Sequence, residues 1–326
     1  MINRRQISLG MAATAFGGLR LTAPAMAQPA WPAKTLRIVV PFPPGGAIDA
    51  MARIVAPYVE KSLGKPVIID NKPGAGGVIG TEAVLRAKDE HTLLMTAMGH
   101  VIYPYLNKTL SFDPLKDFQP IATIALVPNL VVVPASSPFH SLAELIAYAK
   151  AHPGELTYGS AGVGTSLHLT AALFAAMAGI TLKHVPYKGS APAITDLIGG
   201  RIDLMFDSST SSSPMIREGK LRALATATTQ RSAALPHLPT IAEAGVPGYQ
   251  VDWWYGLLAP AGQSEGAVAQ VAEAVSEALD ADEVKKRFAT IQIDPLKTGR
   301  PAFRNRLVQD SKTWGAVIQK LGISPE

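Results

Sequence analysis

An apolar segment that runs through a proline- and glycine-rich loop into a helix is the most constraining feature of this chain. The segment Leu36-Arg37-Ile38-Val39-Val40 predicts a buried strand, and the loop that follows reads Pro41-Phe42-Pro43-Pro44-Gly45-Gly46. A helix is expected from about Ala47. The prolines stiffen the loop, and the glycines, which have no Cβ, let a ligand reach backbone N–H groups at the positive end of the helix. This loop is therefore predicted to hold a small anion.

A second loop has similar chemistry and lies about one domain further along the chain. It reads Gly159-Ser160-Ala161-Gly162-Val163-Gly164-Thr165-Ser166, between a short predicted strand, Leu156–Tyr158, and an apolar helix, Thr165–Ala178. Its hydroxyls and flexible backbone are able to hold a carboxylate by neutral hydrogen bonds. The alternative is that the same hydroxyls only cap the next helix. Two such loops suggest a ligand clamped between two lobes.

Strand and helix signals alternate along the whole chain after residue 27, a pattern typical of parallel sheets covered by helices. Two apolar runs, Ile121–Leu126 and Leu130–Val133, resemble a strand that crosses between lobes, and Tyr249–Leu258 resembles the return crossing. We therefore expect an α/β chain in which residues 28–130 and 249–326 form lobe 1 and residues 131–248 form lobe 2.

Local signals predict where several elements begin and end. Ser141-Leu142-Ala143-Glu144 is a capping box that opens a helix to about Ala151. Pro57, inside the first helical pattern, predicts a kink or a break. After the predicted strand Asp203–Asp207, a serine-rich loop is expected before a short helix that ends near Gly219.

Residues 1–27 resemble an export signal. Arg4-Arg5 form a basic start, a mildly apolar stretch follows from Ile7 to Leu19, and Ala25-Met26-Ala27 resembles a cleavage site. The paired arginines favour the twin-arginine route, with an ordinary secretory signal as the alternative. Cleavage removes three arginines and no acid, so the formal charge falls from +5 to +2. The mature protein is thus expected in the periplasm, and its basic pI says little about partners.

Several classes of function lack their signals. The chain has no cysteine, so it forms no disulfide or thiolate metal site, and its seven histidines show no metal-ligand spacing. It has no basic block with interleaved aromatics, which argues against a nucleic-acid partner. Motifs of hydrolases, zinc proteases and phosphate-binding loops are missing. We expect no catalytic residue, no metal and no cofactor.

The glycine-rich stretch Gly74-Ala75-Gly76-Gly77-Val78-Ile79-Gly80 resembles a dinucleotide-binding loop, which would make the chain an oxidoreductase. Its spacing is not G-x-G-x-x-G, and the next strand ends in Thr96-Ala97-Met98 without an acid for a ribose hydroxyl. We therefore expect this stretch to line the cleft or to support the first loop.

Two acidic residues and a pair of tryptophans are further candidates. Asp49 is the only acid near the first loop, and it either stabilises the first turn of the helix or faces a ligand. Asp207, at the end of a strand, belongs either to a third wall of the cleft or to a solvated turn. At most one of Trp253 and Trp254 can face the cleft, because neighbouring strand residues point to opposite sides. His168, one turn into its helix, is expected to be structural.

Taken in order, six strings resemble the periplasmic solute-binding proteins of tripartite tricarboxylate transporters, also called the Bordetella uptake family. They are residues 43–49, Asn71-Lys72-Pro73-Gly74-Ala75-Gly76-Gly77, residues 160–168, His184-Val185-Pro186-Tyr187-Lys188-Gly189, residues 219–225, and Glu243-Ala244-Gly245-Val246-Pro247-Gly248. The resemblance covers nearly the whole mature chain. It implies a hinged type II binding-protein fold with a central cleft.

The resemblance also implies a function. A small organic carboxylate would be captured and delivered to the membrane subunits of such a transporter, by a protein expected to be a monomer. Asp49 would then contact the ligand directly or through water. The alternatives are an orphan periplasmic ligand sensor for a two-component system and an exported hydrolase or oxidoreductase. The residues predicted to bind the ligand are Phe42, Pro44, Gly45, Gly46, Ala47, Asp49, Ser160, Ala161, Gly162, Gly164, Thr165, Ser166 and Asp207.

Overall fold

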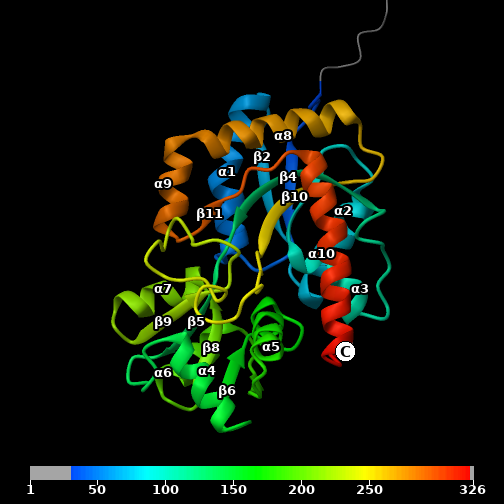
Figure 1. The fold of residues 1–326 in the computed structure, drawn as a ribbon. Coiled ribbons are helices and arrows are strands. Elements are labelled where there is room, and N and C mark those ends of the chain that lie inside the picture. Colours follow the sequence, from blue (N-terminus) through cyan, green and yellow to red (C-terminus); the bar gives the residue numbers. More distant parts are fainter. Residues whose placement is uncertain (1–30, 324–326) are drawn as a thin grey trace, which may run out of the picture.

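The computed structural model describes residues 31–323 and consists of two α/β lobes, each built around one β-sheet (Figure 1). The two-lobed α/β fold expected from the sequence is confirmed. The predicted export signal, residues 1–27, lies outside the described residues. Between residues 31 and 323, no helix has both the length and the apolar character needed to cross a membrane.

The first sheet has six strands in the order β11-β4-β10-β3-β1-β2. The bounds of its strands are β1 Leu36–Val40, β2 Val67–Asn71, β3 Thr92–Ala97, β4 Phe118–Leu126, β10 Trp254–Pro260 and β11 Asp294–Pro295. β1 pairs in parallel with β2 and β3, whereas β10 runs antiparallel to both β3 and β4. The two-residue β11, which pairs with β4, was not predicted from the sequence.

The second sheet has five strands in the order β7-β6-β8-β5-β9. Their bounds are β5 Asn129–Pro134, β6 Thr157–Ser160, β7 Lys183–Pro186, β8 Leu204–Ser208 and β9 Leu221–Thr226. β6 is parallel to β7 and β8, whereas β5 is antiparallel to β8 and β9. The expectation of parallel sheets thus fails for the two-residue β11 and for two longer strands, β5 and β10. Both longer strands enter their sheet from the other lobe, so they run against the strands that are joined through helical crossovers.

Helices cover both faces of the first sheet (Figure 1). One face carries α1 (Ala47–Leu63), α8 (Glu265–Asp280) and α9 (Asp282–Thr290). The opposite side carries α2 (Val78–Ala87), α3 (Tyr103–Leu106) and α10 (Arg300–Lys320), with short 3-10 turns at Ala75–Gly77 and Met98–Val101. Successive residues of β1 serve the two faces, since Ile38 packs with α1 and α8 whereas Val39 belongs to the cluster that contains α2 and α10.

Helices cover both faces of the second sheet as well. α4 (Leu142–Ala151) and α5 (Ser166–Ala178) share a core with Val131, and α6 (Ser190–Ile198) and α7 (Ser209–Arg217) share a core with Leu130. The capping box that opens α4 is confirmed, because the Glu144 N–H donates to the Ser141 hydroxyl and the Glu144 carboxylate accepts from the Ser141 N–H.

Two local expectations differ from the structure. α1 continues through Pro57, so the predicted break is wrong, whereas the kink stays a prediction. Pro57 itself is exposed, and Val55, Ala56 and Val59 on both sides of it are buried in the core. The serine-rich stretch after β8 is not a loop. Ser208 caps α7 by accepting the Thr210 N–H, and the following serines form the first turns of the helix.

Two connections join the sheets. Residues 127–128 lead from β4 to β5, and residues 227–253 lead from β9 to β10. The Val127 N–H donates to the Trp253 carbonyl at 3.1 Å, and the Ala227 N–H donates to the Asn129 carbonyl at 2.8 Å. The connections therefore lie side by side.

Candidate ligand site

The first loop is held by the carboxylate of Asp49. This residue lies in the first turn of α1, is 4% exposed, and accepts the Gly45 N–H at 2.9 Å. Arg53, one turn later, donates its Nε–H to both carboxylate oxygens at 3.0 Å, and Asn71 at the end of β2 donates its amide at 3.0 Å. Asn71 also donates to the Phe42 carbonyl at 3.1 Å. Asp49 thus ties the loop to α1 and β2 through side chains within the protein.

The charge of this anchor is balanced. Burial opposes ionisation of the Asp49 carboxyl, but the hydrogen bonds from Arg53, Gly45 and Asn71 outweigh it and hold the pKa below its ordinary value of 3.8. The Arg53 side chain is 51% exposed and neutralises Asp49. A second anion near this loop therefore meets little net repulsion.

The loop leaves hydrogen-bond donors open. Gly46 is the N-cap of α1 and offers no side chain to the helix. Within residues 31–323, no protein acceptor is bonded to the backbone N–H groups of Gly46, Ala47 or Ile48. Pro44, Gly45 and Gly46 are exposed. Uncapped N–H groups at a helix N-terminus attract anions, so the loop is able to bind a carboxylate as the sequence suggested.

The glycine-rich stretch before α2 supports the first loop, which confirms the structural role preferred over a dinucleotide site. A Cβ at Gly77 would collide with the Tyr103 hydroxyl and lie 3.4 Å from Phe42 Cζ. A Cβ at Gly80 would lie 2.7 Å from Pro41. These glycines let α2 pack directly against the loop.

The second loop is organised by Ser160 and His184. Ser160 is fully buried, its hydroxyl lies 2.7 Å from His184 Nε2, and the Gly162 N–H donates to that hydroxyl at 3.1 Å. The following loop runs alongside, because the Tyr187 N–H donates to the Ser160 carbonyl and the Gly189 N–H donates to the Ala161 carbonyl.

The start of α5 is capped from within. The Thr165 hydroxyl donates to the Gly162 carbonyl at 2.7 Å and accepts the His168 N–H at 3.4 Å. The Gly164 N–H donates to His168 Nδ1 at 3.0 Å, so the structural role expected for this histidine is confirmed. The capping role of Thr165 is real, and the N–H groups of Gly162 and Gly164 already have acceptors. Ser166 begins α5 and is partly exposed.

Two stacked imidazoles lie behind the second loop. The rings of His168 and His184 are 4.2 Å apart and nearly parallel, and Tyr158 stacks on His184 at 4.7 Å. Burial lowers the pKa of both histidines, and the neighbouring His168 also helps to bring the pKa of His184 to about 4. Both rings are therefore neutral at neutral pH.

Helix α3 brings the two loops to one place. Its first residue, Tyr103, donates to the Gly76 carbonyl at 3.1 Å and lies beside Gly77, where a Cβ would approach both the Tyr103 hydroxyl and Phe42 of the first loop. Its last residue, Leu106, packs against the second loop so closely that a Cβ at Gly164 would lie 2.8 Å from Leu106 Cδ1. Because four helical residues rise by only about 6 Å, the two predicted loops are neighbours across the lobes. No feature of the sequence pointed to α3.

Asp207 is buried rather than exposed on a wall. It is fully inaccessible at the end of β8, where it accepts the hydroxyls of Ser190, Ser211 and Ser212, the last two at 2.5 Å. Burial raises the pKa of this carboxyl in spite of the three hydroxyls. The solvated turn proposed as an alternative is therefore wrong. Asp207 joins the N-termini of α6 and α7 behind the second loop.

The tryptophan pair belongs to the interior. Trp253 is 4% exposed and Trp254 is fully buried. The Trp254 indole donates to Asp310 at 2.7 Å, and the Trp253 indole donates to Thr170 of α5 at 2.8 Å. Neither ring is a free platform for a ligand.

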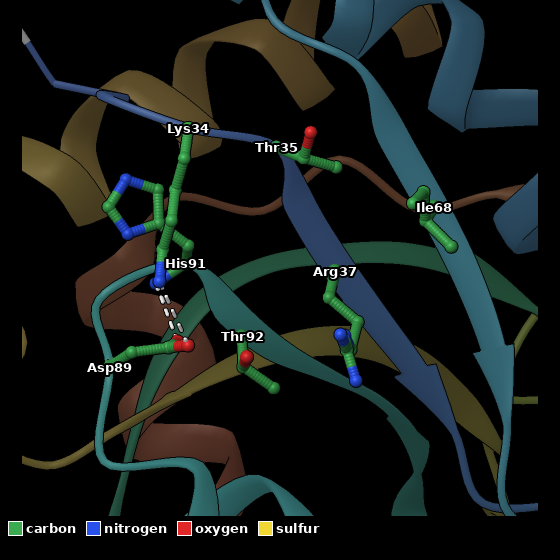
Figure 2. A pocket seen from close by; sticks show the side chains of 7 residues that line it. All are labelled: Lys34, Thr35, Arg37, Ile68, Asp89, His91 and Thr92. Carbon is green, nitrogen blue, oxygen red and sulfur yellow. Dashed lines mark hydrogen bonds and ion pairs between the residues drawn. The ribbon is translucent and has the colours of Figure 1, made fainter.

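A cavity of about 230 Å³ lies at the amino ends of β1 and β3 (Figure 2). Its lining consists of Lys34, Thr35, Arg37, Ile68, Asp89, His91 and Thr92. The ion pair between Lys34 and Asp89 spans it at 3.5 Å. Ligands of open α/β sheets bind at the carboxyl ends of the strands, so this cavity is separate from the candidate site. Residues 31–323 contain no group of three acidic or histidine side chains that could hold a metal ion.

Two α/β lobes joined by paired connections, with a glycine-containing loop before a helix in each lobe, are typical of the class of two-lobed solute-binding proteins. A family model described as the tripartite tricarboxylate transporter family receptor matches residues 51–323. The chain belongs to this family of solute-binding receptors, so the resemblance noted in the sequence is confirmed.

Individual relatives support the same family assignment. Protein BugT of Bordetella pertussis is 34% identical over 299 residues, which cover 90% of each chain. The structure of Rpa4515 from R. palustris with adipate has a TM-score of 0.80 and 37% identity, and the match covers 91% of this chain and all of that one. MatC from Rhodopseudomonas palustris with bound malate has a TM-score of 0.75 and 33% identity, with 88% of this chain and all of that chain covered.

Proposed function

We propose that this protein captures a small organic carboxylate between its two lobes in the periplasm and hands it to the membrane subunits of a tripartite tricarboxylate transporter. The observation that supports this most directly is the set of open N–H groups at Gly46, Ala47 and Ile48, next to a second loop that is drawn close by α3. The adipate and malate bound by two relatives of the same fold support the ligand class. The protein carries out no reaction in this proposal.

Charges around the loops favour an anion. Asp49 is neutralised by Arg53, the two histidines behind the second loop are neutral, and Lys188 is exposed on the loop that follows β7. Ligand recognition would therefore rest on backbone N–H groups and hydroxyls, with Lys188 adding a long-range attraction.

The proposed function requires two lobes, and we assign the residues to them as the sequence predicted. Lobe 1 comprises residues 28–130 and 249–326 and lobe 2 comprises residues 131–248, except that Asn129 and Leu130 already lie in β5 of the second sheet. Closure of the cleft would take place at the paired connections near Val127 and Ala227. The protein acts as a monomer, and residues 1–27 direct its export by the twin-arginine route.

Replacing Ala47 with proline tests the first loop with little structural cost. Ala47 is the first residue of α1, where proline is well tolerated, and Gly46 before it is extended (φ −79°, ψ 170°), as proline requires. Ala47→Pro deletes one N–H that no protein group uses. A hydrogen bond to a charged group contributes about 1.5–3 kcal/mol, so affinity should weaken by about tenfold or more.

The measurement is calorimetric titration with adipate and with malate, after thermal melts with each acid and with neutral adipamide. A ligand at about 100 times its Kd adds about 2.7 kcal/mol of stability. Asp282→Pro is the matched control, because Asp282 is the exposed first residue of α9, a helix that contributes no residue to either loop. Unchanged affinity in Ala47→Pro would remove the first loop from the site. If no acid in a panel of short mono- and dicarboxylates raised the melting temperature, a carboxylate would be the wrong ligand class.

A further inference from the structure

Thr170 of α5 is hydrogen-bonded to the second connection between the lobes and to Asn129, the residue that directly follows the first connection. The Thr170 side chain is fully buried. Its hydroxyl accepts the Asn129 amide at 3.1 Å and the Trp253 indole N–H at 2.8 Å, and its carbonyl accepts the Tyr249 hydroxyl at 2.9 Å. Asn129 begins β5 directly after the first connection, whereas Tyr249 and Trp253 belong to the second. Three donors from two chain crossings therefore converge on one threonine.

Trp253, one of these donors, also contacts a helix of the first lobe. The Trp253 ring lies 5.3 Å from the ring of Trp314 in α10, at an angle of 36°. Trp253 is thus held between α5 and α10, and all three elements belong to one continuous apolar cluster. The Trp253 carbonyl also accepts the Val127 N–H of the first connection. Any rotation of one lobe against the other must act on this contact.

The second loop leads directly into α5, the helix that contains Thr170. α5 is capped by Thr165, and Thr170 lies about one turn after the first helical residue, Ser166. The loop and the joint are coupled along a single helix that packs against β6 and β8. An anion bound at the second loop would therefore act on the helix that holds Thr170.

We propose that Thr170 is a positioning residue, which transmits occupation of the second loop to the two interlobe connections. This inference rests on the proposed capture of a carboxylate. Thr170 does not touch the ligand. Its role is to hold α5, the two connections and α10 in fixed relative positions. Ligand binding at the second loop and rotation of the lobes then occur together.

Thr170→Val tests the role because valine keeps the shape and removes the acceptor. Trp253→Phe removes the indole donor from the other side, and it serves if the valine variant does not fold. Because it also removes one ring of the Trp253–Trp314 pair, it is read by the radius of gyration and by adipate affinity, not by circular dichroism. Thr123→Val is the matched control. Thr123 is 1% exposed, donates to the Leu296 carbonyl at 2.6 Å and accepts the Thr298 N–H at 3.0 Å, so it loses comparable bonds within one lobe.

The first readout needs no ligand. Two indoles at 5.3 Å produce an exciton couplet in far-ultraviolet circular dichroism, which is assigned here by its loss in Trp314→Phe. Thr170→Val should change the couplet and raise the radius of gyration measured by small-angle scattering. Thr123→Val should change neither, even at an equal loss of melting temperature. A wild-type couplet and radius in Thr170→Val would overturn the proposal whatever the ligand is.

The second readout uses adipate, with malate as the second probe. Wild-type binding should alter the couplet, and Thr170→Val should bind about tenfold more weakly than Thr123→Val. If adipate binds wild type without changing the couplet, and Thr170→Val binds it within twofold of wild type, the coupling is wrong while carboxylate capture stands. If neither acid binds any variant, these ligands are wrong for the protein, and the ligand-free comparison alone decides the role of Thr170.

Discussion

Replacing Asp49 with asparagine keeps the shape of the side chain and removes the charge that anchors the first loop. The lost terms are a charge-assisted bond to the Gly45 N–H, about 1.5–3 kcal/mol, the pair with half-exposed Arg53, about 0.5 kcal/mol, and the helix-dipole term, about 0.5 kcal/mol. The asparagine oxygen still accepts one bond, which returns about 1 kcal/mol. The free energy of unfolding should fall by about 2 kcal/mol and the melting temperature by about 4 °C.

Ligand affinity should fall as well, although the Asp49 carboxylate is already used by three protein donors. Without the pull on the Gly45 N–H, the loop that presents the N–H groups of Gly46 and Ala47 is no longer fixed. A loss of preorganisation worth about 1.4 kcal/mol is a tenfold change in Kd.

Thermal melts give the change in melting temperature, and calorimetric titration with adipate, or with malate if adipate does not bind, gives the change in Kd. Asp282→Asn is the control, because Asp282 is an exposed first-turn acid of α9 and reports the helix-dipole term alone. A stability loss with affinity within twofold of wild type would show that Asp49 serves the fold and not the site. An affinity loss with unchanged melting temperature would refute the anchor and favour direct contact with the ligand.

Three further results are expected. Gly164→Ala should lower stability and ligand affinity more than Gly179→Ala, because both glycines have a positive φ (76° and 64°) but only the first would meet a neighbour, at 2.8 Å; equal effects in melts and titrations would show that strain alone acts. Burial lowers the pKa of His184 from 6.5 to about 4, so the unfolded chain takes up a proton at a higher pH than the folded chain, and the free energy of unfolding should fall as the pH drops from 6.5 to 4. His184→Gln should flatten this fall in thermal melts, and equal slopes of melting temperature against pH in the variant and wild type would contradict the reasoning. Replacing Arg4 and Arg5 with lysine should leave precursor in the cytoplasm on fractionation, whereas a normal periplasmic yield would exclude the twin-arginine route.

The sequence by itself determined most elements of the two lobes and the position of both loops. Strands such as Leu36–Val40, the capping box at Ser141 and the glycines before α1 act through the residues next to them, so their signals can be read locally. The first chain crossing was also visible as two apolar runs separated by Pro128 and Asn129, and the return crossing was visible as the run Tyr249–Leu258. The break predicted at Pro57 is wrong, because the buried residues Val55, Ala56 and Val59 hold the helix against the core on both sides of it, and that packing is decided by the tertiary structure.

Only the tertiary structure decided what the polar residues do. Asp49 is bonded to Asn71 from another strand, Asp207 is buried by serines of two helices, and Thr170 is reached by Trp253, 83 residues further along the chain. The direction of β5 and β10 likewise depended on how the chain moves between lobes. A local pattern shows that a residue is polar or apolar, but its hydrogen-bond partners are set by packing between distant segments, and those partners determine whether it anchors a loop, binds a ligand or joins two lobes.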